Sequence, residues 1–185
     1  MVPKSSYNIV ELDLPGVLLI TSQVRSDERG FSISAYDADE FSMCGITTKF
    51  VMDYISYSKK DVIRGLHFQT APYAQDKLIR CATGRVFDVV ADYEPTSRTF
   101  KTFVQVELNS EKGEMLFVPG KYAHGFCVLS DEGALIEYKM SEGYHPESAG
   151  GIRFDDPLFA IPWPVANPIL STQDKEWPLF PLTRI

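Results

Sequence analysis

The chain has 185 residues, of which 44% are hydrophobic and 23% charged, an ordinary globular composition for one domain or two small ones. It carries 18 Lys and Arg against 25 Asp and Glu, and the resulting net charge of −7 argues against nonspecific binding to nucleic acid or anionic membranes, which depends on clustered cations. Its apolar runs are too short to span a bilayer, and residues 1–6 lack the apolar core of a signal peptide, so we expect a cytoplasmic protein.

Short segments rich in β-branched and aromatic residues follow one another along the chain, as is typical of strands. The segment at 103–108 alternates apolar and polar residues, which predicts one wet face, whereas 115–118 and 126–129 are continuously apolar and predict strands covered on both faces. Thr83 and Gly84 form an expected two-residue turn between two of the segments. The expected strands are 7–12, 17–21, 50–55, 61–69, 78–82, 85–90, 103–108, 115–118, 126–129 and 134–139.

Helices are scarce. Residues 37–43 could form about two turns, capped by Asp37 and ended by Gly45, and residues 171–175 a short turn behind Ser171. Many short strands separated by turn residues indicate a sandwich or barrel, and without a repeat or linker we expect one domain over residues 1–185. The proline-rich segment 157–181 contains several aromatic residues, so we expect it to pack across the barrel.

The three cysteines, Cys44, Cys81 and Cys127, are far apart and form no C-x-x-C pair. We interpret them as free buried thiols of a reducing compartment, with neither a zinc site nor a disulfide framework.

The three histidines are the first candidates for chemistry, because imidazole transfers protons near neutral pH. They form no H-x-H or H-x-x-x-H pair, so we expect no metal. His67 in a strand and His124 in a turn could each be purely structural, and His145 is expected to be solvated. Strict alternation in strand 61–69 places Arg64 on the face opposite His67.

The order of ten short segments resembles the dTDP-4-dehydrorhamnose 3,5-epimerase family over nearly the whole chain. They are 27–31 (DERGF), 64–69 (RGLHFQ), 74–80 (AQDKLIR), 84–89 (GRVFDV), 117–120 (FVPG), 123–126 (AHGF), 138–139 (YK), 151–157 (GIRFDDP), 161–164 (IPWP) and 170–174 (LSTQD).

The resemblance implies an all-β, cupin-type β jelly roll with a few short helices, in a homodimer that exchanges N-terminal strands. It implies an isomerase that needs no metal and no organic cofactor. Such enzymes epimerise nucleotide-diphosphate-linked 4-keto-6-deoxyhexoses at C3 and C5, beside the ketone, and supply deoxysugars such as rhamnose for polysaccharide biosynthesis. An exposed edge at strand 7–12 also favours a dimer, because unpaired edges invite pairing.

The reaction needs a base for the α-proton, a cation or donor for the enolate, and an acid on the opposite face. By resemblance, His67 is the base, Asp174 the carboxylate that orients it, Lys77 the enolate-stabilising cation and Tyr138 the acid. Each has a plainer interpretation, a solvated strand lysine for Lys77 and a core tyrosine for Tyr138.

The remaining assignments concern substrate binding and also rest on the resemblance. Arg64 is expected to reach the phosphates, which requires a bulge in its strand. His124 is expected to contact the sugar and Tyr144 to lie near the nucleotide base. Arg29 and Phe31 are expected to reach the nucleotide of the partner subunit.

Four positions depart from the pattern of the family. Met52 and Tyr54 stand where Gln and Asn commonly contact the substrate, Ser34 where a Glu recognises thymine, and Gln173 where a basic residue is frequent. Polar contacts dominate discrimination between substrates. The carrier could therefore be thymidine, cytidine, uridine or guanosine diphosphate, and the enzyme could invert only C3 or only C5. A 3,4-ketoisomerase and a non-catalytic sugar-nucleotide binding module are the alternatives from other classes.

Overall fold

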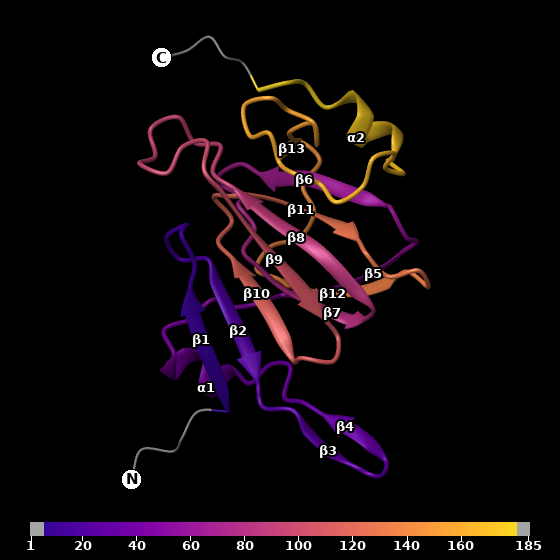
Figure 1. Cartoon of the computed structure of the whole chain (residues 1–185). Helices are drawn as coiled ribbons and strands as arrows, with labels where there is room; N and C mark the ends of the chain where they lie inside the picture. Colours follow the sequence, from indigo (N-terminus) through magenta and orange to yellow (C-terminus); the bar gives the residue numbers. More distant parts are fainter. Residues whose placement is uncertain (1–5, 181–185) are drawn as a thin grey trace.

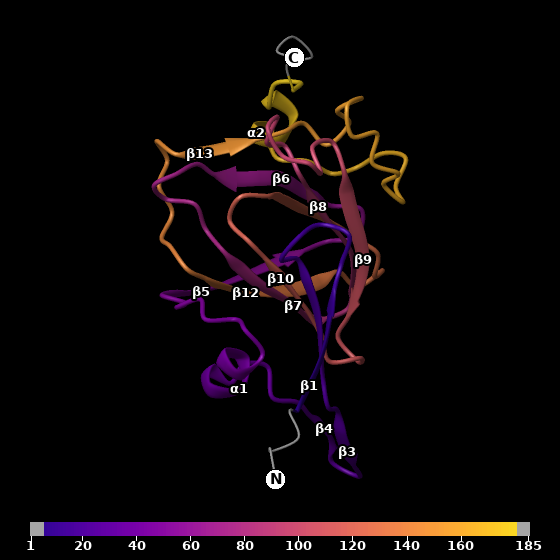
Figure 2. The same cartoon turned by 90° about the vertical axis from the view of Figure 1, so that its left-hand side faces the viewer.

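The computed structural model describes residues 6–180 of the chain (Figure 1). The expectations for residues 1–5 and for Pro181 therefore lie outside the described part. Within it, the chain forms two facing antiparallel sheets, which Figure 2 shows as two layers. The all-β jelly roll with short helices predicted from the sequence is confirmed.

The six-stranded sheet has the order β1 (Tyr7–Glu11), β2 (Leu18–Ser22), β10 (Glu114–Val118), β7 (Lys77–Thr83), β12 (Ala134–Met140) and β5 (Met52–Ser58). The five-stranded sheet has the order β13 (Ala149–Gly151), β6 (Ile63–Gln69), β11 (Ala123–Val128), β8 (Arg85–Ala91) and β9 (Phe103–Asn109). A separate hairpin of β3 (Arg25–Asp27) and β4 (Gly30–Ser32) extends from one end of the molecule (Figure 1).

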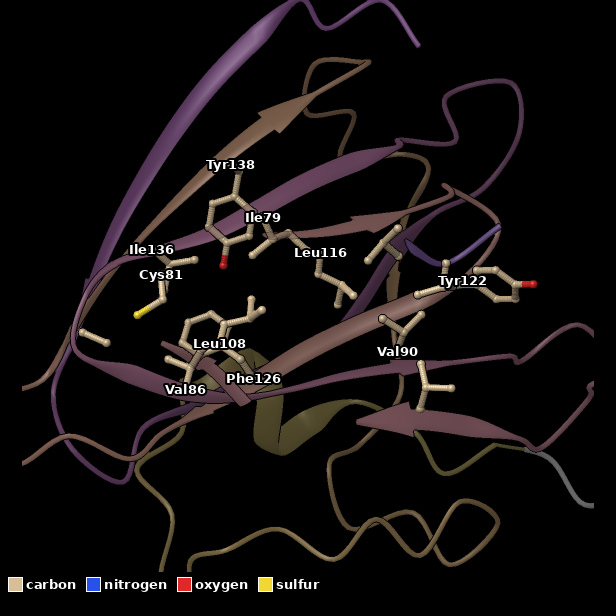
Figure 3. Close-up of a cluster of buried hydrophobic side chains, with 14 of the residues drawn as sticks. Ile79, Cys81, Val86, Val90, Leu108, Leu116, Tyr122, Phe126, Ile136 and Tyr138 are labelled. Carbon is tan, nitrogen blue, oxygen red and sulfur yellow. The ribbon is translucent and has the colours of Figure 1, made fainter. Parts of the chain in front are cut away.

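The main core lies between the two sheets (Figure 3). Inward-facing residues alternate along the strands, as Val86 and Val90 of β8 do, because successive side chains of a strand point to opposite faces. β10 and β11 are buried almost throughout, and β9 exposes Gln105 and Glu107 while burying Val104 and Leu108. The predicted double-sided and one-sided burial of these strands is confirmed.

The turn predicted at Thr83 and Gly84 is a corner between the sheets. Gly84 has the positive φ, +85°, that the prediction required. However, β7 belongs to the six-stranded sheet and β8 to the five-stranded one, so the two strands do not pair as a hairpin. A Cβ on Gly84 would lie 2.5 Å from the carbonyl oxygen of Gly133, and this close backbone approach is a second reason for glycine there.

The proline-rich C-terminal segment covers the outer face of the five-stranded sheet, as expected. Phe159 and Ile161 are buried there against Leu66 and Val89. The segment then leads into α2 (Thr172–Glu176), capped by Ser171 as predicted. Packing of the preceding segment on the sheet thus determines where this short helix lies.

The other expected local features are mostly present. α1 (Ala38–Met43) begins behind Asp37, whose Oδ1 accepts hydrogen bonds from the backbone N–H groups of Asp39 and Glu40. Cys81 and Cys127 are buried free thiols, and burial raises the pKa of each to about 11. Cys44 is only half-buried, because it ends α1 at the surface, so the expected burial is wrong for this thiol. No helix within residues 6–180 is long and apolar enough to cross a membrane.

Candidate active site

Strands β6 and β13 of one sheet face β5 and β12 of the other (Figure 2). Residues of these four strands line a cavity of about 310 Å³. The structure brings together there seven residues predicted from the sequence. They are Tyr54, Arg64, His67, Lys77, His124, Tyr138 and Tyr144.

A bulge in β6 turns Arg64 toward the same cavity as His67. In the pairing with β11, His67 lies opposite His124 and Arg64 opposite Phe126, so two residues of β6 face the single Gly125. The extra residue breaks strict alternation, and both side chains line the cavity. The prediction that Arg64 faces away from His67 is therefore wrong, and the bulge required by the resemblance is present.

His67 and Asp174 form a close pair across 107 residues of sequence. The Nε2 atom of His67 lies 2.5 Å from Oδ1 of Asp174, which projects from α2. The hydroxyl of Ser171 donates to the other oxygen, Oδ2, at 2.8 Å. Burial pushes the pKa of Asp174 upward, but these hydrogen bonds and the charge of His67 together hold it below its ordinary value. Asp174 is therefore an ionised partner that orients the imidazole.

Lys77 is a buried cation at the start of β7. Only 9% of the residue is exposed, and burial lowers its pKa to about 8, although the nearby Asp88 carboxylate opposes the shift. An ammonium group in such a dry position interacts more strongly with developing negative charge than one in water.

Tyr138 reaches the cavity from β12 in the opposite sheet. Figure 3 shows it beside Ile79, its ring pointing from its own strand into the space between the sheets. Burial, together with the negative charge of Asp88, raises the pKa of its phenol strongly. The phenol therefore stays protonated over the physiological range.

Sequence reasoning assigned no role to Asp88, which is fully buried beneath the site. Its Oδ1 and Oδ2 atoms lie 2.9 and 3.0 Å from Nε2 of His124. Burial raises the pKa of Asp88, while His124 and Lys77 oppose the rise. The available signal was a lone carboxylate within the otherwise apolar run 86–91, since buried charges are retained only with partners.

Several other cavity residues were also unassigned. Gln69 lies two residues after His67 in the strand and faces the same side, so the alternation of side chains could have predicted that it lines the cavity. Trp177 packs its ring edge-on against His67, with centroids 6.3 Å apart, a contact that no local pattern indicates. Gln75 and Ser56 also line the cavity.

Four residues expected to bind substrate lie elsewhere in the single chain. Arg29 and Phe31 sit on the β3–β4 hairpin, at the end of the molecule opposite α2 (Figure 1). Ser34 exchanges a hydrogen bond of 2.9 Å with the hydroxyl of Tyr7, and Met52 packs against the main core. The structure thus joins none of these four to the His67 cavity, whereas Gln173 does line it.

Comparison with known proteins places the chain among sugar-nucleotide enzymes. The family model described as dTDP-4-dehydrorhamnose 3,5-epimerase matches residues 11–181. A protein of that name from Shigella flexneri is 43% identical over 168 residues, covering 90% of this chain and 92% of the relative. A dTDP-4-dehydrorhamnose 3-epimerase from Streptomyces niveus is 34% identical, with 89% and 80% covered.

A solved structure gives the same result for the fold. The dTDP-6-deoxy-D-glucose-3,5-epimerase of Legionella pneumophila, determined in complex with dTDP-4-keto-L-rhamnose, superposes with a TM-score of 0.89 at 38% identity. The alignment covers 96% of this chain and 95% of that structure.

Proposed function

The chain belongs to the dTDP-4-dehydrorhamnose 3,5-epimerase family, and we propose that it epimerises a dTDP-linked 4-keto-6-deoxyhexose in the cavity around His67. It is accordingly an isomerase. The observation that carries the assignment of residues is the convergence of His67, Lys77 and Tyr138 on one cavity from two different sheets.

Proton removal begins at His67. Asp174 occupies Nε2, so Nδ1 is the nitrogen that accepts the proton from the carbon beside the ketone. The C–H electron pair forms a double bond to the carbonyl carbon, and the π electrons of the ketone move to its oxygen, which gives an enolate. The Asp174 carboxylate stabilises the imidazolium that results, as the aspartate of a catalytic triad does.

The enolate and its reprotonation involve the other two groups. The buried ammonium of Lys77 stabilises the negative oxygen. Tyr138 donates its phenolic proton to the carbon from the face opposite His67 and regains a proton from solvent. The configuration of the carbon is inverted because the base and the acid act from opposite walls of the cavity. A positioned acid or base of this kind contributes ~10²–10⁴-fold.

Substrate binding involves further residues that line the cavity. Arg64 faces the diphosphate, His124 the sugar and Tyr144 the nucleotide base. The guanidinium of Arg64 is already held by the Ser58 hydroxyl, to which its Nε donates at 2.8 Å. Fixing the cation in advance reduces the side-chain entropy lost on binding.

A homodimer completes the proposal. β1 is an outer strand of the six-stranded sheet, and the β3–β4 hairpin carries Arg29 and the half-exposed Phe31 away from their own cavity. Both features suit exchange with a second copy, in which this hairpin reaches the nucleotide of the partner. The buried free thiols Cys81 and Cys127 suit a reducing compartment, so we expect the cytoplasm.

Solvent deuterium tests the proposal. Incubating the enzyme with dTDP-4-keto-6-deoxyglucose in D₂O should place deuterium at C3 and C5, and a coupled 4-reductase should trap the inverted product. His67→Asn should slow exchange by ~10²–10⁴-fold. Absence of exchange with thymidine, uridine, cytidine and guanosine carriers would refute the function, as would movement of the ketone to C3 in the product NMR spectrum.

Inversion at C3 alone is the second candidate, favoured by the similarity to the 3-epimerase of Streptomyces niveus. It predicts deuterium at C3 and none at C5 after complete turnover. The same experiment therefore separates it from the 3,5-epimerase.

A further inference from the structure

Gln69 is the last residue of β6, two positions beyond His67, and only 5% of it is exposed. Its Nε2 group donates to the carbonyl oxygen of Tyr73 at 2.8 Å and to that of Gly143 at 3.0 Å. Its Oε1 atom accepts from the backbone N–H of His145 at 2.8 Å. Gly143 and His145 are the two chain neighbours of Tyr144.

We propose that Gln69 is a positioning residue that holds Tyr144 in the wall of the cavity by gripping the backbone on both sides of it. The inference rests on the proposed function, in which Tyr144 meets the nucleotide. Strand β6, which carries His67, would then also position the loop at residues 143–145.

The hydrogen-bond inventory of the amide argues against direct substrate binding by Gln69. A glutamine side chain has two N–H donors, and both are already used by backbone carbonyls. A bond to substrate would have to replace one of these two bonds, and the gain from the new bond would be largely offset by the loss of the old one. Gln69 therefore acts through the loop.

Tyr144 needs such support because 65% of it is exposed. An exposed ring is held by few packing contacts, so the backbone of residues 143–145 sets where it lies. A ring already placed for stacking loses less conformational entropy when the nucleotide binds.

Neighbouring contacts reinforce the same loop. Gln75 donates from Nε2 to the carbonyl oxygen of Glu142 at 2.6 Å. The rings of Tyr73 and His145 stack with centroids 3.7 Å apart and planes inclined by 8°. Gln69 joins these two segments to each other and to β6, and it is the member of the group that contacts both neighbours of Tyr144.

A double-mutant cycle tests the proposal, using Gln69→Leu, Tyr144→Ala and the double variant. The measurements are the dissociation constant of dTDP by calorimetry, and kcat and KM for the 4-keto sugar nucleotide. We expect Gln69→Leu to weaken dTDP binding and raise KM by about tenfold, with kcat within about twofold, because the groups at the reacting carbons stay in place. In the Tyr144→Ala background the same change should have less than about a twofold effect on binding.

Controls keep structural damage distinct from positioning. Gln105→Leu, on the exposed face of β9, should leave all three constants unchanged. Hydrogen exchange should increase at the His145 amide in Gln69→Leu and be unchanged in Gln105→Leu. If Gln69→Leu does not fold, Gln69→Glu removes both donors and should give the same changes in dTDP binding, KM and kcat. Because it keeps the acceptor for His145, hydrogen exchange at that amide should not increase in this variant.

Three outcomes would overturn the inference. They are unchanged dTDP binding in Gln69→Leu, equal effects of that change with and without Tyr144, or a fall in kcat at constant KM. The last would show that Gln69 acts through His67 instead. Failure of the wild-type protein to bind dTDP and to exchange deuterium would refute the proposed function, a result that the variants do not affect.

Discussion

Burial changes the pKa of a single residue, Lys77, in a way that suits its proposed role. Desolvation disfavours the ammonium form and lowers the pKa from 10.5 to about 8, so the group is still charged at neutral pH. Burying the ammonium group costs desolvation energy, which is consistent with an electrostatic role. In the proposed reaction, Lys77 stabilises the negative charge that develops on the enolate.

The pH dependence follows from this pKa. We expect kcat/KM, which reports the free enzyme, to fall above about pH 8 as Lys77 loses its proton, approaching tenfold per pH unit. Tyr138 does not cause this fall in kcat/KM, because its raised pKa keeps the phenol protonated. In Lys77→Arg the fall should move to higher pH, since a guanidinium stays charged. If kcat/KM fell at the same pH in that variant, Lys77 would not be the group that stabilises the enolate.

The free energy of unfolding should rise with pH above about pH 8, whereas kcat/KM falls. Because the folded lysine has the lower pKa, the unfolded chain binds more protons between about pH 8 and pH 10.5. The contribution of Lys77 to the free energy of unfolding therefore increases across that window. Urea denaturation should show this rise for the wild type relative to Lys77→Met, whereas a parallel pH dependence would contradict it.

At this scale, the sequence was most informative where a residue lies in a segment that resembles the family. His67, Lys77, Tyr138 and His124 were named from such segments, and all four line one cavity. Asp88 was missed because the chemistry of a buried carboxylate depends on neighbours from other strands, here His124 of β11 and Lys77 of β7. A local pattern marks the charge as unusual but does not identify its partners.

At the scale of elements, the bulge in β6 controls the site. Gly65 has a φ of +119°, and a Cβ there would lie 2.6 Å from Cα of Gly125 and 2.7 Å from the carbonyl oxygen of His124. β6 and β11 therefore approach too closely for any side chain. This approach is what lets Arg64 and His67 share a face.

Gly65→Ala should consequently destabilise the protein and displace both side chains. Gly30→Ala is the matched control, because Gly30 has a similar φ of +123° but nothing within 4 Å of its Cβ position. We expect the control to cost about 1 kcal/mol of unfolding free energy from backbone strain alone. Gly65→Ala should cost about 2–4 kcal/mol, since overpacking adds to that strain. Equal losses in urea denaturation would contradict a steric role for the bulge.

The corner at Gly84 illustrates the limit of element prediction. Two apolar strands separated by two residues favour a hairpin on local grounds. The observed corner places β7 and β8 in opposite sheets, where each strand is paired on both edges: β7 with β10 and β12, and β8 with β11 and β9. Pairing with strands far away in the sequence overrides the local preference for a hairpin, and the sequence around the turn does not reveal these partners.

At the scale of the whole molecule, the single chain brings together the proposed catalytic groups but leaves Arg29 and Phe31 on a hairpin remote from them (Figure 1). A second copy would resolve this separation if the dimer were domain-swapped, because each subunit would then receive the hairpin of the other.

Mixed dimers test that arrangement. Co-refolding equal amounts of His67→Asn and Arg29→Ala chains should give half heterodimers, and if Arg29 acts on the partner's site, one of the two sites in each is intact. At substrate well below KM we expect about a quarter of wild-type activity, above the average of the two parent variants. No gain over that average, or a monomeric mass by light scattering, would place Arg29 outside the partner's site.

The sequence by itself determined the all-β fold class, the helix caps at Asp37 and Ser171 and the burial of the central strands, because these depend on residue type and short spacing. It also named the candidate catalytic side chains, through the resemblance of its segments to the family. Only the tertiary structure decided that Arg64 faces His67, that β7 and β8 part at Gly84, and that Gln69 grips the neighbours of Tyr144. Each of these depends on how strands far apart in sequence approach one another, and that approach is a property of packing between sheets.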